Sequence, residues 1–158
     1  MDPQQQFFQA LSALRAGDLA QCEKICDSLL ALNSREVNTL RLRAQVWQRR
    51  GELARAATGF QAAIAIAADF AHAWADLGRV QYDLGQLAEA EHSLRRAIAL
   101  DSKLKGPSKL LETLLHDLGK TDQSDKLAAV NRQRTALKDK VVQAFKLYTE
   151  GDPAAAEA

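Results

Sequence analysis

Glycine recurs at a fixed interval along most of this chain. Gly17, Gly51, Gly85 and Gly119 follow one another at 34 residues. Three further columns keep the same register: Leu19, Leu53, Leu87 and Thr121; Cys22, Ala56, Ala90 and Ser124; and Cys26, Phe60, Leu94 and Ala128. A period of this length is that of a repeated pair of helices. Such pairs stack into an extended array with a concave surface rather than around one enclosed pocket.

Apolar residues recur at intervals of three and four, which predicts helices, and the alternation by two that is typical of strands is absent. We therefore expect an all-α fold in which each glycine ends the first helix of a pair in the left-handed conformation. Asp2 and Pro3 form a helix start, and Gly106–Pro107 another. The expected single domain, 1–158, has repeats at about 3–36, 37–70, 71–104 and 105–136, with a truncated fifth from 137.

The segment 121–149 contains no glycine or proline where a turn between repeats is due. Either a turn forms near 136–139, or two helices fuse into one long helix. We favour the turn, because Gly151 returns almost on schedule. Gly151–Asp152–Pro153 then has the pattern of a new helix start. We accordingly expect the chain to be a piece of a longer protein, cut within a fifth repeat.

The third unit carries the strongest family pattern. Trp74-Ala75-Asp76-Leu77-Gly78 fits a W-x-x-L-G opening, and Gly85, Ala90, Leu94 and Ala97 follow at the matching positions. The chain thus resembles the tetratricopeptide repeat family, strongly from 37 to 104 and weakly at both ends. The proline common at the end of that repeat is replaced by Ser34, Ala68 and Ser102. The resemblance implies a right-handed superhelical stack, held closely together through small residues such as Ala44 and Gly78.

In proteins similar to this one, the first helix of each pair lines the concave face. Carried over by position, the partner-binding candidates are Asn38, Arg41, Gln45, Gln48 and Arg49, then His72, Ala75, Arg79, Tyr82 and Asp83, and finally Lys109, Thr113 and His116. Three arginines on one curved face would favour an acidic peptide. The alternative is an ordinary solvated helix face. The clamp with which some relatives grip a C-terminal carboxylate is not present, since Phe7, Leu11, Leu42, His72 and Asp76 occupy its sites.

No pattern in the sequence points to catalysis, a metal or a cofactor. Lys plus Arg total 21 and Asp plus Glu 20, so the charge gives no sign of a nucleic-acid partner. Cys22 and Cys26, four apart, fit two small buried residues better than a redox pair or half a metal site. A signal peptide and a membrane span are both absent from the sequence pattern, and we expect a cytoplasmic protein of bacterial style.

The expected function is that of a non-catalytic module that binds a protein or peptide in its concave groove. Two alternatives stay open. The chain could be the accessory arm of a larger enzyme, such as a sulfotransferase or glycosyltransferase. It could also form a homodimer through its C-terminal helices, where Val141, Phe145 and Tyr148 would lie uncovered.

Overall fold

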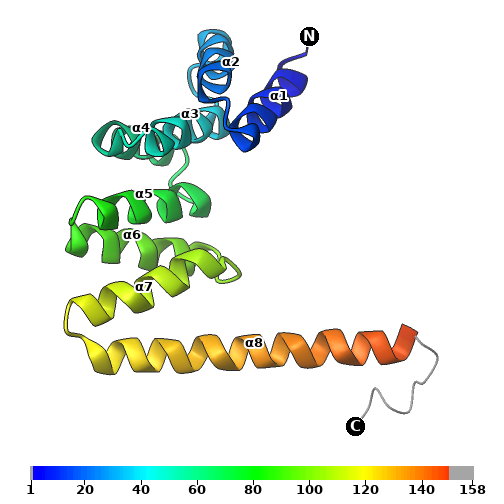
Figure 1. Ribbon diagram of the computed structural model, residues 1–158, viewed down its shortest axis with the longest axis vertical. Coiled ribbons are helices and arrows are strands. Elements are labelled where there is room, and N and C mark those ends of the chain that lie inside the picture. The colour runs from blue at the N-terminus through cyan, green and yellow to red at the C-terminus, as the bar shows by residue number, and fades with distance from the viewer. Residues whose placement is uncertain (1, 150–158) are drawn as a thin grey trace.

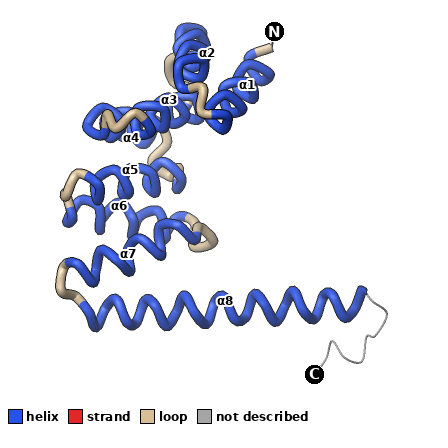
Figure 2. The backbone as a smooth tube through the Cα atoms, viewed as in Figure 1, coloured by secondary structure: helices blue, strands red, loops and turns tan. Residues whose placement is uncertain are grey.

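The computed structural model describes residues 2–149, and the segments that it describes fold into eight α-helices without a β-strand. They are α1 (Pro3–Ala16), α2 (Leu19–Leu32), α3 (Val37–Arg49), α4 (Leu53–Ile66), α5 (Ala71–Asp83), α6 (Leu87–Leu100), α7 (Lys105–Asp117) and α8 (Thr121–Thr149). The helices stack step by step as antiparallel pairs, from α1 at one end to α8 at the other (Figures 1 and 2). The expected all-α superhelical stack is confirmed.

From the second pair on, the first helix of each pair packs against both helices of the preceding pair. α3 contacts both α1 and α2, α5 contacts both α3 and α4, and α7 contacts both α5 and α6. The buried residues accordingly form several clusters along the stack. One of them joins Leu42 and Val46 of α3 to Cys22 and Cys26 of the first pair. No single central core exists among the described residues, so each pair depends on its neighbours for burial.

The recurring glycines end the first helix of every pair as predicted. All four have positive φ angles, between 70° and 83°, where a Cβ atom would be strained. At Gly51 the amide donates to Gln48 O over 3.0 Å, and the Glu52 amide donates to Trp47 O over 2.9 Å. This is the Schellman arrangement, which satisfies the last carbonyls of the helix and turns the chain back.

Two glycines inside helices permit close helix contact. A Cβ atom on Gly78 would lie 2.8 Å from Leu94 Cγ, so α5 and α6 touch there, as the sequence predicts. Gly59, which the sequence analysis did not single out, does the same for α4 and α3. A Cβ atom there would lie 2.8 Å from Ala44 Cβ and 2.9 Å from Trp47 Cζ3.

The turn favoured near 136–139 is wrong, because α8 continues without a break from Thr121 to Thr149. The proposed boundary at 137 therefore falls inside a helix. The far half of α8 projects beyond α7 (Figure 1). At the other end, Asp2 precedes α1 as expected, but its side chain makes no capping hydrogen bond. The predicted helix start at Gly151–Asp152–Pro153 lies outside the described residues.

Candidate binding surface on the first helices

Polar contacts tie each first helix to the next. Arg41 Nε donates to Asp76 Oδ2 over 2.6 Å, which joins α3 to α5. Tyr82 Oη donates to Asp117 Oδ2 over 2.6 Å and joins α5 to the end of α7. Arg49 Nη1 donates to Leu14 O over 2.5 Å and joins α3 to α1. Each contact links residues 35 apart, one more than the repeat period. These three contacts, called the rungs below, set the spacing of the surface.

In the first rung the Asp76 carboxylate neutralises the positive charge of Arg41 that was expected on this face. Asp76 also accepts from Gln45 Nε2 over 3.0 Å, and the Arg41 guanidinium lies 5.8 Å from the centre of the Phe70 ring. The Arg41 and Asp76 side chains are only 25% and 19% exposed. A half-buried arginine in an ion pair presents little positive potential to a partner protein, because the carboxylate beside it cancels that potential at short range.

Arg79 is placed differently. Its side chain is exposed on α5, and no hydrogen bond or ion pair joins it to another of the residues 2–149 for which contacts are described. Its Nη2 atom would lie 3.8 Å from a Cβ atom on Gly106, at the start of α7. Arg79 therefore stands at the junction of α5 and α7 with its donors available.

The other candidates fall into two groups. His72 and Asp83 are exposed on α5, and Gln48 is half-buried on α3. The remaining side chains contact near neighbours in the sequence: Asn38 Nδ2 donates to Glu36 Oε1 over 3.1 Å, Lys109 Nζ lies 3.5 Å from Glu112 Oε1, Thr113 Oγ1 donates to Lys109 O over 3.3 Å, and His116 Nδ1 lies 3.9 Å from Asp117 Oδ1. The structure thus brings together Arg41 and Gln45 but does not bring the α7 candidates to them.

The phenol of Tyr82 is fixed as a donor. Its hydrogen bond to the Asp117 carboxylate raises the pKa of Tyr82, because removal of the proton would set two negative oxygens against each other. Tyr82 is therefore neutral at physiological pH and holds α5 against α7.

A hollow that the sequence analysis missed lies at the N-terminal end. It encloses about 420 Å³ between the start of α1, the end of α2 and the start of α3. Phe7 and Leu29 line it together with Leu32, which is 74% exposed. Its polar edge is Glu36, whose Oε2 accepts from the Thr39 amide over 2.5 Å. The signal that the sequence offered was Leu32 itself, an apolar residue directly before the polar turn at Asn33.

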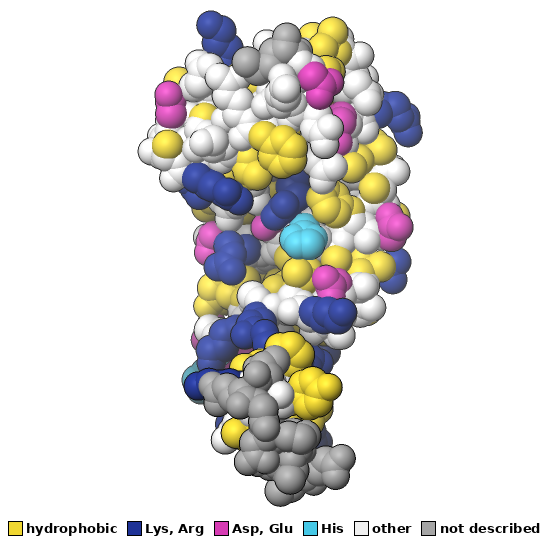
Figure 3. Space-filling model, turned by 90° about the vertical axis from the view of Figure 1, so that its right-hand side faces the viewer, with side chains coloured by type: hydrophobic (Ala, Val, Ile, Leu, Met, Phe, Trp, Pro, Cys, Tyr) yellow, Lys and Arg dark blue, Asp and Glu magenta, His cyan; other side chains and the backbone are white. Residues whose placement is uncertain are grey.

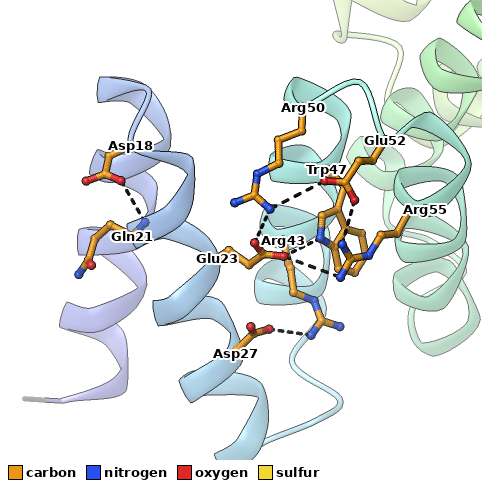
Figure 4. A network of polar contacts seen from close by, with 9 residues as sticks. All are labelled: Asp18, Gln21, Glu23, Asp27, Arg43, Trp47, Arg50, Glu52 and Arg55. Atoms are coloured by element: carbon orange, nitrogen blue, oxygen red, sulfur yellow. Dashed lines mark hydrogen bonds and ion pairs between the residues drawn. The ribbon is translucent and has the colours of Figure 1, made fainter.

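Other side chains of α3 contact the neighbouring helices α2 and α4 and so hold the stack together (Figure 4). Glu23 on α2 accepts from Trp47 Nε1 over 2.8 Å and from the Arg50 guanidinium. The Trp47 ring lies between two guanidinium groups, with Arg43 at 5.0 Å and Arg55 at 4.2 Å from its centre. The bond from Trp47, with help from Arg50, lowers the pKa of Glu23 despite partial burial. This network fastens the first pair of helices to the second.

The two cysteines pack within the first helix pair. Cys22 and Cys26 are both fully buried and free, in agreement with the packing interpretation, and burial raises the pKa of each thiol. Within residues 2–149 no three His, Cys, Asp or Glu side chains are grouped so that they could hold a metal ion. None of the helices described is both long enough and apolar enough to span a membrane.

Comparison with known proteins agrees with this architecture. Family models described as tetratricopeptide repeat match residues 71–104 and 37–58. No curated protein matches the chain significantly. Among solved structures, MamA 41-end from Desulfovibrio magneticus RS-1 superposes with a TM-score of 0.78 at 17% identity, over 87% of this chain and 78% of that one.

Two further solved structures share this fold. The first tetratricopeptide domain of Spaghetti (RPAP3), bound to the HSP90 peptide SRMEEVD, has a TM-score of 0.70 at 15% identity and covers 74% of this chain and 93% of that one. The O-GlcNAc transferase of Thermobaculum terrenum has a TM-score of 0.69 at 25% identity, over 72% of this chain but only 22% of the transferase chain. The repeat models show that this chain contains tetratricopeptide repeats, at 37–58 and 71–104, and the shared fold and the stacked helix pairs agree with that architecture.

Proposed function

We propose that this chain binds a segment of a partner protein along the first helices, with Arg79 as the principal contact. The observation that carries the proposal is the availability of the Arg79 guanidinium on a surface whose other arginines serve the rungs. A guanidinium offers five donors in a fixed plane and binds carboxylates bidentately. His72, about two turns away on the same helix and also exposed, would extend the contact along α5.

The fold gives independent support to a protein or peptide partner. A tetratricopeptide structure with an HSP90 peptide bound is among those similar to this one. The rungs hold successive first helices in fixed relation, so a partner would meet a preformed surface and lose little binding energy to ordering. The proposed contact is narrower than the three-arginine face expected from sequence, because the Asp76 carboxylate pairs with Arg41, and Nη1 of the exposed Arg49 already donates to Leu14 O.

The test begins with peptides selected from a random display library against the folded protein. Their dissociation constants are then measured for the wild type, for Arg79→Glu and for a matched control, Arg96→Glu. Arg96 is exposed on α6, a second helix, and carries the same charge. Arg79→Glu should weaken binding at least about tenfold, equivalent to ~1.4 kcal/mol, and Arg96→Glu should not. Equal loss in both variants, or no loss in either, would refute the proposal.

A second candidate function is that of an accessory domain in a larger enzyme. It is favoured by the likeness to the O-GlcNAc transferase, which covers most of this chain and about a fifth of the transferase chain. On this proposal the chain would position a substrate protein for a catalytic domain elsewhere. Transferase activity in the full gene product that falls on deletion of residues 2–149, with the catalytic domain still folded, would support it. Unchanged activity on protein substrates would refute it.

A third candidate is self-association through α8. Its far half exposes Leu137, Val141, Phe145 and Tyr148 at 60–69% each, which is unusual for large apolar side chains on a single helix. Sedimentation velocity across a range of concentrations tests this proposal. A concentration-dependent dimer that Val141→Ser with Phe145→Ser abolishes would support it, and a monomer throughout would refute it.

A further inference from the structure

The last helix pair leaves an open groove where the other pairs hold a helix. α3, α5 and α7 each fill the angle beside the preceding pair. The corresponding angle beside α7 and α8 is a groove of about 910 Å³. Because α8 runs straight on instead of turning back, none of the described residues fills it.

The groove is strongly basic. Six of its lining side chains are cations and two are acids: Lys103, Lys105, Lys109, Arg132, Arg134 and Lys138 against Glu112 and Asp139. Only Lys109 is close to an acid, at 3.5 Å from Glu112. Arg134 donates to a backbone carbonyl, Ser102 O, over 2.7 Å, which leaves its charge uncancelled. Basic side chains gather in the lower part of the face shown in Figure 3, just above the grey terminal residues.

The floor of the groove is uncharged. Ala128, which is 9% exposed, lies along α8 with Thr135, Ala136 lies at the exposed edge, and Ser108 of α7 donates to Asn131 Oδ1 over 2.8 Å. The first turn of α7 opens on the same space without a side-chain cap, and this adds a partial positive charge. A narrow floor of small side chains between two rows of cations suits a helix with an apolar stripe and acidic flanks.

We propose that this groove, at the α7–α8 end of the stack, is a docking site for an acidic amphipathic helix of a partner protein. The occupant takes the place that a further first helix would hold. Its carboxylates meet the lysines and arginines of both walls, and its small apolar stripe covers Ala128 of α8. Arg79 does not line this groove, although Gly106, beside Arg79, adjoins the groove residue Lys105.

Other occupants fit the observations less well. A single-stranded nucleic acid would need aromatic side chains for its bases to stack on, and none lines the groove. The far half of α8 from a second copy would bring Lys138 and Lys140 against like charges. Its exposed Leu137 also lies on the opposite side of α8 from Ala128, since nine residues turn a helix by half a revolution.

The test uses a fluorescein-labelled synthetic helix of about four turns with an alanine and leucine stripe flanked by glutamates. A second peptide carries lysine in place of each glutamate, and an oligothymidylate of equal charge serves as a polyanion control. The protein variant is the triple reversal Lys105→Glu, Arg132→Glu and Lys138→Glu. A matched control reverses Lys24, Arg35 and Arg96, which are exposed and lie away from the groove. Circular dichroism confirms that both variants fold.

The acidic helix should bind the wild type and the matched control alike and bind the groove variant at least about tenfold more weakly, equivalent to ~1.4 kcal/mol. In NMR titrations the amide shifts should change at Ala128, Asn131 and Thr135. Absence of binding to the wild type, equal loss in the matched control, or equal affinity for the oligothymidylate would each overturn the proposal. A loss on Arg79→Glu as large as in the groove variant, without amide shifts at Ala128 and Asn131 in the wild type, would assign the peptide to the surface around Arg79 and overturn the proposal too.

Discussion

Gly59 offers the sharpest test of how the helix pairs are held together. It lies within α4 and is buried against α3. A Cβ atom at this position would meet two groups that cannot easily move: Ala44 Cβ at 2.8 Å, attached directly to the backbone, and the Trp47 ring at 2.9 Å. Trp47 is itself held by the hydrogen bond to Glu23 and by two flanking guanidinium groups. The substitution Gly59→Ala must therefore separate α3 from α4.

Two opposing effects set the magnitude. Alanine is a better helix former than glycine by about 0.8–1.0 kcal/mol, and this favours the variant. Overpacking of a close contact costs about 1–3 kcal/mol. Gly59→Ala should thus be destabilising by about 1 kcal/mol, and by up to about 2 kcal/mol if Trp47 holds its position. For a chain of this size, 1 kcal/mol corresponds to a shift in Tm of about 2–4 °C.

The matched control is Gly106→Ala in α7. A Cβ atom there would meet only Arg79 Nη2, at an ordinary distance of 3.8 Å. This variant should gain the helix preference without the clash, although less fully because residue 106 lies in the first turn. Urea unfolding followed by circular dichroism gives both free energies. If Gly59→Ala proves as stabilising as Gly106→Ala, the helices are not in close contact at Gly59 and the reasoning fails.

Three further predictions concern the polar contacts and the thiols. Asp76→Ala should destabilise the stack by about 1 kcal/mol, less in high salt, because Arg41 loses its partner; equal stability in urea unfolding would contradict this. The pKa of Glu23 is lowered in the folded state. Its contribution to the free energy of unfolding is therefore present above about pH 4.3 and disappears as pH falls through the folded pKa. Glu23→Gln should flatten that part of the profile of stability against pH, and an unaltered profile would show that Glu23 is not the cause. Cys22 and Cys26 should react with a thiol reagent only at the rate of unfolding, since both are buried with raised pKa values, and rapid labelling of the native protein would contradict this.

The regular part of the fold could be predicted because every repeat restates it. The four glycines spaced 34 residues apart predicted left-handed turns, and the structure has a positive φ angle at each of them. The binding surface was less predictable, because the helix face on which a side chain lies does not reveal which residue of the next helix it contacts. Arg41 and Arg79 lie about one helical turn apart in the repeat, yet Arg41 meets Asp76, whereas Arg79 faces Gly106. A search for opposite charges 35 residues apart, rather than 34, would have found the first rung.

The continuous α8 was mispredicted because the repeat period was given more weight than the local chemistry. Positions 33, 67, 101 and 135 are equivalent in the repeat, and the first three follow the end of a second helix. The Asn33 and Asp101 side chains each accept a hydrogen bond from the amide two residues on, which favours a turn there. At the fourth position Thr135 Oγ1 instead donates to Asn131 O, one turn back within the same helix.

Ala67 shows that a turn can form without such a side chain, so the following residues must also be considered. There Phe70, three positions on, is half-buried against a core that includes Leu30 and Ala73. That burial holds the start of the next helix in place. The equivalent of Phe70 after Thr135 is Lys138, whose ammonium group would lose hydration if it were folded into a similar contact. Helix continuation leaves Lys138 in solvent and keeps every backbone hydrogen bond, so α8 extends past its repeat and the groove beside it stays open.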